Sequence, residues 1–137
     1  MRLNVWISLN GLKKTAYSGF DFPYEAISPS NAKKRLFRGI NDVYDEIMRI
    51  YEATEQKGLS IGQSLYSSCA FFVDYSILLD SKMQDRIKEY NYCKTFSCSP
   101  YPSMMETPAN VIDDFMIIEQ EINQCIQEKQ KEANNVS

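Results

Sequence analysis

The sequence contains no histidine, which narrows the chemistry that its other side chains could perform. Histidine is the usual proton shuttle near neutral pH and the commonest metal ligand. Its absence excludes Ser-His-Asp and Cys-His catalysis and every zinc site that requires an imidazole. Catalysis would therefore need carboxylate, lysine, tyrosine or cysteine side chains, and the sequence has no GxGxxG, phosphate-binding loop or CxxC motif.

Four cysteines are the next candidates for chemistry: Cys69, Cys93, Cys98 and Cys125. A four-cysteine zinc site needs two closely spaced pairs, and only Cys93 and Cys98 are close, so we expect no metal and no cofactor. Because we expect no signal peptide, we also expect free thiols in a reducing, cytoplasmic compartment. If oxidised, Cys93 and Cys98 could close a small disulfide loop.

Four cations, Lys33, Lys34, Arg35 and Arg38, lie in the first third of a predicted helix. The helix dipole disfavours positive charge there, and a phosphate or an acidic partner would relieve the repulsion. Nucleic-acid binding through these residues is therefore one hypothesis. The alternative is a solvated helix face, on which Arg38 would pair with Asp42 four residues later.

Carboxylates occur in three close groups, and Asp74 interrupts an otherwise apolar segment. A hydrolase needs two carboxylates facing each other across a cleft, and a divalent cation needs oxygen ligands converging from several elements. A carboxylate- or cysteine-based enzyme is one alternative, and solvated helix-surface charge is the default interpretation, for Asp74 as well. The groups are Asp42, Asp45 and Glu46; Asp113 and Asp114; and Glu119 and Glu121.

The segment from Tyr90 to Thr107 is rich in aromatic and methionine side chains. These residue types are enriched in protein interfaces, where a ring or a flexible thioether fills a pocket. We predict a partner-binding surface here, and the alternative is that the segment folds back to cap the helices. The candidate residues are Tyr90, Tyr92, Phe96, Tyr101, Met104 and Met105.

The composition of the 137 residues indicates one folded domain, with 44% hydrophobic and 24% charged residues and a net charge of −3. We predict a single domain over residues 1–132 and a frayed tail over 133–137. The most apolar segment, Leu65 to Leu79, is too short to span a membrane. Residues 1–38 are net basic and residues 39–137 net acidic, which predicts a polarised molecule unless folding mixes the two parts.

The amino-terminal third should contain a β-hairpin. Residues 2–9 alternate between apolar and polar positions, as in a strand, and Asn10-Gly11 is the favoured two-residue hairpin turn. The hairpin would cover about residues 2–18. Ser28-Pro29 then looks like a helix cap followed by proline at the first helical position.

Three long helices should follow, over about 28–56, 60–90 and 107–132. Apolar residues recur in them at three- and four-residue steps, and Gly58 and the prolines of the 92–107 loop separate them. The prediction is a mostly α (α+β) fold, an antiparallel three-helix bundle with the hairpin packed on one side.

These observations favour a non-enzymatic protein-binding module of the inhibitor, immunity or adaptor type, which acts through a protein partner. The acidic composition, the lack of a catalytic motif and the aromatic loop all fit this class. The alternatives are a nucleic-acid-binding protein that uses residues 33–38 and an enzyme built on carboxylates or cysteine. A homo-oligomer is a further alternative, because the apolar stripes could pair between chains.

Overall fold

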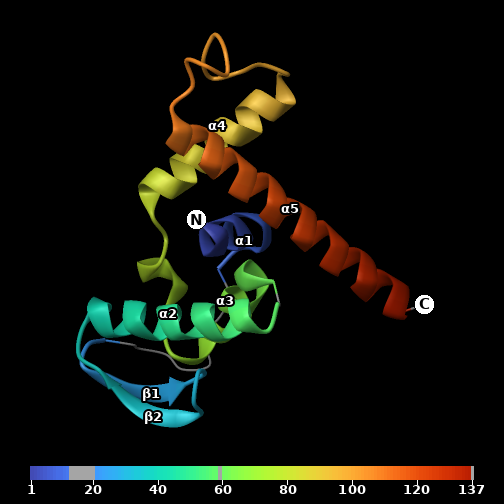
Figure 1. The fold of residues 1–137 in the computed structure, drawn as a ribbon. Helices are drawn as coiled ribbons and strands as arrows, with labels where there is room; N and C mark the ends of the chain where they lie inside the picture. The colour runs from blue at the N-terminus through green and yellow to red at the C-terminus, as the bar shows by residue number, and fades with distance from the viewer. Residues whose placement is uncertain (13–20, 59, 137) are drawn as a thin grey trace. The chain divides into compact units, whose positions relative to one another are not determined.

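The structure is a computed structural model that describes residues 1–12, 21–58 and 60–136 (Figure 1). In these residues it has five α-helices, two 3-10 helices and one two-stranded antiparallel sheet. The mostly helical class is confirmed, whereas the arrangement of three long antiparallel helices is not. Contacts divide the chain into two compact units, unit 1 (Met1–Leu9 and Leu79–Ser137) and unit 2 (Asn10–Leu78). A single domain composed of both stays a prediction.

Unit 1 contains the helices α1 (Arg2–Asn10), α4 (Ser81–Thr95) and α5 (Ala109–Val136). Each contributes to one apolar core, in which Val5, Ile87, Tyr90 and Ile118 are buried. The Tyr90 ring meets Phe115 edge-on, with 5.4 Å between ring centroids. Helix α5 starts close to the predicted start at about residue 107 and continues to Val136, into the segment predicted to fray.

The predicted hairpin over 2–18 is wrong for its described part, because Arg2–Asn10 is a helix. Gly11 has φ +82°, so Asn10-Gly11 ends a helix instead of turning a hairpin. A glycine with positive φ suits both structures. The five consecutive residues from Leu3 to Ile7 are all buried. The alternation of apolar and polar residues therefore does not correspond to a strand with one buried and one exposed face. The second predicted arm falls mostly on residues 13–20, outside the described residues.

Unit 2 holds the observed hairpin, which lies further along the chain. Strands β1 (Tyr24–Ser28) and β2 (Lys33–Phe37) pair in a register from Tyr24↔Phe37 to Ser28↔Lys33. They are followed by α2 (Ile40–Gln56), α3 (Ile61–Ser68) and the 3-10 helices η1 (Cys69–Phe71) and η2 (Tyr75–Ile77).

The helix predicted to start at Ser28-Pro29 is therefore a hairpin up to Phe37. The Ser28 carbonyl accepts hydrogen bonds from the backbone N–H groups of Asn31 and Ala32, at 3.3 and 2.8 Å, and Ala32 has φ +59°. Proline fixes the same φ at the first position of a helix and at the second position of a turn, so this dipeptide fits either.

The helix predicted over 60–90 is also wrong, because it consists of four shorter pieces. Asp74 accepts a hydrogen bond from the Ser76 N–H and Asp80 from the Met83 N–H, both at 3.0 Å, so each carboxylate caps a new helix. Asp74 is exposed, but as a cap and not on the back face of a helix. The predicted stop at Gly58 is confirmed, since α2 ends at Gln56 and Gly58 has φ +66°.

An aromatic stack fixes the hairpin of unit 2 to the segment after α3. Neighbouring rings in the series Phe22, Tyr24, Phe37 and Phe72 lie 5.3–5.4 Å apart. The Tyr24 hydroxyl donates to the Phe72 carbonyl at 2.6 Å, and burial raises the pKa of Tyr24 to about 12. This core sets the orientation of β2 and hence of its charged side chains.

Candidate protein-binding surface

An open groove of about 760 Å³ lies in unit 1 between α5 and the segment 96–108 that connects α4 to α5 (the α5 groove). Figure 1 shows this segment arching away from the end of α4 and back to the start of α5. The lining is mainly apolar. Its apolar residues are Tyr90, Pro100, Met104, Val111, Ile112, Phe115 and Met116, and its polar residues are Ser99, Thr107, Glu119, Gln120 and Asn123.

Local hydrogen bonds hold the connecting segment beside the groove. Ser97 has φ +51°, and the Cys98 N–H donates to the Cys93 carbonyl at 3.0 Å, which closes the end of α4. Further on, the Thr107 hydroxyl donates to the Ser103 carbonyl at 2.7 Å, and the Thr107 N–H donates to the Met104 carbonyl at 3.1 Å. These bonds form a turn that carries two methionines.

Large apolar side chains at and near the groove are left in water. Met105 is 94% exposed, Met104 75% and Met116 67%. Phe96 and Tyr92 are also exposed, and their rings contact each other at a centroid distance of 4.8 Å. Met104 and Met116 line the groove itself, and exposed apolar surface in a groove marks interaction sites in soluble proteins.

The six residues predicted to bind a partner have different positions. Tyr90 and Met104 line the α5 groove, although Tyr90 is also a buried core residue. Tyr92, Phe96 and Met105 are exposed and do not line it, and Tyr101 is half-buried. Their sequence segment therefore provides one wall of the groove.

The other wall, on α5, was missed by the sequence analysis. It includes Ile112, Phe115 and Met116. The prediction for the helix over about 107–132 gave it an apolar stripe and assigned none of its residues to a partner-binding surface. Apolar residues beyond those needed for one buried stripe were the available signal.

The charged side chain that lines the groove, Glu119, is acidic and has a cationic neighbour. Lys94 lies 3.3 Å from the Glu119 carboxylate and 5.7 Å from the centroid of the Tyr90 ring. Unit 1 contains seven lysines and arginines against ten aspartates and glutamates, whereas unit 2 contains eight of each. Folding thus mixes the basic amino-terminal part with acidic residues, and the net negative charge belongs to unit 1.

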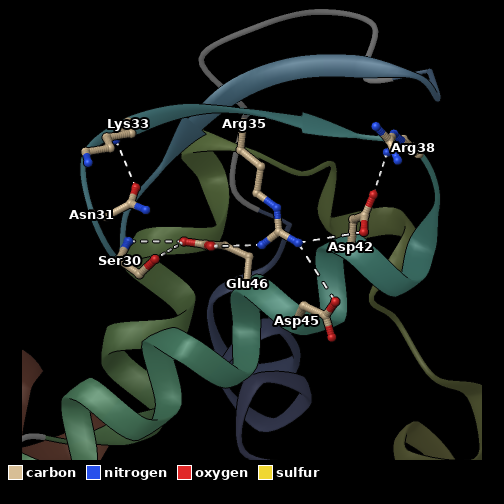
Figure 2. Close-up of polar contacts among 8 residues, drawn as sticks. All are labelled: Ser30, Asn31, Lys33, Arg35, Arg38, Asp42, Asp45 and Glu46. Atoms are coloured by element: carbon tan, nitrogen blue, oxygen red, sulfur yellow. Dashed lines mark hydrogen bonds and ion pairs between the residues drawn. The ribbon is translucent and has the colours of Figure 1, made fainter.

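Lys33, Lys34 and Arg35 of the predicted basic cluster lie on strand β2 instead of a helix, and Arg38 directly follows the strand. Figure 2 shows Lys33, Arg35 and Arg38. The Arg35 guanidinium points toward α2, where it lies 3.4 Å from Glu46, 3.7 Å from Asp42 and 3.8 Å from Asp45. Glu46 is fully buried and also accepts bonds from the N–H and hydroxyl of Ser30, at 3.1 and 2.7 Å. The Arg35 guanidinium is therefore paired with carboxylates of unit 2.

The remaining three cations of the cluster are exposed. Lys33 and Lys34 follow the hairpin turn, and Arg38 follows the end of the strand. The backbone N–H of Arg38, and not its side chain, donates to Asp42 at 2.9 Å. Consecutive side chains of a strand point to opposite faces, so Lys34 and Arg35 cannot contribute to one anion-binding surface.

The described residues also include the buried carboxylate of Glu121 and four cysteine thiols. Glu121 is buried in unit 1 and accepts from Arg2 at 2.6 Å and from the Trp6 indole at 2.8 Å. Within the described ranges, no three cysteines or carboxylates converge as a metal site would require. All four cysteines are free thiols, and only Cys98 is exposed.

The chain matches no protein-family model, no curated protein and no solved structure. None of the helices in the described residues combines the length and the apolar character needed to cross a membrane.

Proposed function

We propose that this chain is a non-enzymatic protein-binding module that receives an amphipathic segment of a partner protein in the α5 groove. One observation carries the proposal: Met104 and Met116 line the same open apolar groove from opposite walls and are both exposed. Burying a side chain of this size contributes about 1.5–3 kcal/mol. A few such contacts supply the energy of a specific complex.

The shape and composition of the groove favour a peptide segment as the occupant. The groove is open along α5, as is typical of sites in which a helix lays its apolar face. Methionine side chains adapt to the apolar surface that they meet. Because unit 1 is net acidic, we expect basic residues beside the apolar face of the partner segment.

The proposal also covers the class of binding protein and its location in the cell. An inhibitor, an immunity protein or an adaptor acts by covering a surface of another protein, and none of these needs a catalytic group. The single carboxylate among the groove residues, Glu119, is paired with Lys94, which gives an enzyme little support. A cytoplasmic location is proposed with it, since exposed Cys98 is a free thiol.

The test compares two aspartate substitutions on α5. Met116→Asp places a charge in the groove, and Ile126→Asp removes an apolar side chain that is 47% exposed on the same helix outside the groove. Each variant and the wild-type chain are used as bait in lysate, and bound proteins are identified by mass spectrometry after nuclease treatment. We expect a protein that binds wild type and Ile126→Asp and is lost with Met116→Asp.

The binding segment of that protein is then synthesised, and its affinity is measured by calorimetry. An affinity at least tenfold lower for Met116→Asp supports the proposal. Equal affinity for all three proteins would contradict it. Light scattering tests the remaining occupant: a dimer that Met116→Asp dissociates would show that the groove binds a second copy of this chain.

Nucleic-acid binding is the rival that the exposed cations Lys33, Lys34 and Arg38 allow. Replacing all three with alanine should abolish any binding to labelled single- or double-stranded DNA and RNA, and the salt dependence with it. We expect no saturable binding by the wild-type chain. Tight, salt-dependent binding that the triple variant loses would favour the rival.

A further inference from the structure

The end of α4 brings two cysteines together. Cys93 is the third-last residue of the helix and Cys98 lies beyond its end, with the left-handed residue Ser97 before it. The Cys98 N–H donates to the Cys93 carbonyl at 3.0 Å, and the Ser97 N–H donates to the Lys94 carbonyl at 3.4 Å. These two bonds are the Schellman pattern of a helix end, in which the side chains at these two positions frequently contact each other.

The two thiols differ in their access to solvent. Cys98 is exposed, whereas Cys93 is buried, and both residues line the same hollow. Two cysteines can be bridged when their Cα atoms lie within roughly 7 Å, and the backbone bond between the same residues holds them close. The pair thus combines an accessible thiol with a covered one beside it.

We propose that Cys93 and Cys98 form a reversible disulfide by exchange with a small-molecule disulfide such as oxidised glutathione, with Cys98 reacting first. The Cys98 thiolate attacks one glutathione sulfur, which forms a mixed disulfide and releases one glutathione. The Cys93 thiolate then attacks the Cys98 sulfur and releases the second glutathione. The two thiol protons end on the two released glutathione thiolates, the cysteine pair is oxidised by two electrons, and the glutathione disulfide is reduced by two.

The order of the two attacks follows from the surroundings of each sulfur. Burial, and then the neighbouring Cys98, raise the pKa of Cys93, so little of its thiolate is present to start the exchange. Once Cys98 carries glutathione, the Cys93 thiol is already next to the sulfur that it must attack. Cys69 and Cys125 are buried elsewhere and cannot compete for the reagent.

The bond would also act on the α5 groove, a consequence that rests on the proposed function. Both cysteines line a shallow hollow next to the groove, and Ser99 and Pro100 line the hollow and the groove alike. A covalent link at Cys98 therefore fixes the chain directly before one groove wall. We expect oxidation to change affinity for the partner segment.

The test treats the full chain with oxidised glutathione, quenches with acid, and blocks remaining thiols with N-ethylmaleimide before mass spectrometry. Trypsin cleaves after Lys94, which lies between the two cysteines, so the disulfide appears as two peptides joined only before reduction. We expect the wild-type chain to lose two hydrogen atoms in mass and to yield this joined pair. Dithiothreitol should restore both thiols.

Two serine substitutions identify the role of each sulfur. Cys93→Ser should retain one glutathione on Cys98, because no thiol resolves the mixed disulfide, and Cys98→Ser should not react. A wild-type chain that keeps glutathione on Cys98 would overturn the proposal, and so would a Cys98→Ser chain that reacts as fast as wild type. Because no partner is needed, these results are independent of the function proposed for the groove.

Discussion

The α5 groove and the β1–β2 hairpin differ in whether their side chains already have interaction partners within the chain. On the hairpin, Arg35 has three carboxylate neighbours, and buried Glu46 has both Arg35 and Ser30 as partners. At the groove, Met104 and Met116 are exposed and contribute little to the core. Side chains with satisfied partners contribute to stability, whereas exposed apolar side chains are available for binding. The groove is therefore the stronger candidate, although the cation cluster is more conspicuous in the sequence.

The largest expected effect is on the hairpin. Arg35→Ala leaves the buried Glu46 carboxylate without its cation and should lower the free energy of unfolding by about 3 kcal/mol. The matched control is Lys34→Ala on the same strand, whose exposed side chain should change stability by less than about 0.5 kcal/mol. Urea unfolding measures both. Equal losses for the two variants would show that the pairing of Arg35 with Glu46 does not cause the loss.

The next effect is on the other face of α5. Glu121→Ala removes the buried carboxylate that accepts from Arg2 and from the Trp6 indole, which should cost about 2 kcal/mol. Gln120→Ala, at an exposed neighbouring position that lines the groove, is the control and should be close to neutral. Thermal unfolding of both variants shows whether the two faces of one helix divide stability and binding. A loss at Gln120 as large as at Glu121 would argue against that division.

Alkaline pH should weaken unit 2 through its buried acidic groups. Burial raises the pKa of Cys69 to about 12, above an unfolded value near 9, with a smaller effect from Glu46. The stabilisation from keeping this thiol neutral is fully present below pH 9 and is lost as the pH rises toward 12. Between those values, the folding equilibrium falls up to about tenfold per pH unit for this group.

Cys69→Ala isolates this contribution. Its deficit in unfolding free energy relative to wild type should shrink as the pH rises from 9 to 11. Val73→Ala is a suitable control, because Val73 is fully buried in the same unit and does not titrate. A deficit that stays constant with pH for Cys69→Ala would show that this thiol does not cause the alkaline loss.

The smallest effect on stability belongs to the groove. Met116→Ala should leave the free energy of unfolding within about 0.5 kcal/mol of wild type, because the side chain is 67% exposed. Its affinity for the partner segment should nevertheless fall about tenfold. Urea unfolding and calorimetry on one preparation measure both values. A clear loss of stability would show that Met116, like Arg35, stabilises the fold.

The sequence predicted the helical class and the start of α5, but not the boundaries of the other elements. Ser28-Pro29 and Asn10-Gly11 each fit two structures, because proline and glycine fix local φ values that helix ends and turns share. Apolar periodicity also continued from Leu65 to Tyr90 across several short helices. The signals of the breaks were Asp74 and Asp80, which cap η2 and α4.

Half of the candidate site could be predicted from residue types. The aromatic and methionine content of residues 90–107 identified one wall of the groove, and Tyr90 and Met104 do line it. The wall on α5 depends on which side of the helix faces the connecting segment, and that choice is made by contacts distant in sequence. The charges of Lys34 and Arg35 were grouped for the same reason: only the strand assignment separates them.

The division of the chain into units has a consequence for its synthesis on the ribosome. All of unit 2, residues 10–78, is made before any part of α4 or α5, so its contacts can form while the chain is still growing. Unit 1 combines residues 1–9 with residues 79–137. Helix α1 is therefore synthesised long before the helices that it packs against. During that interval the apolar side chain of Val5 on α1 lacks Ile87 and Ile118, with which it is buried in the folded unit.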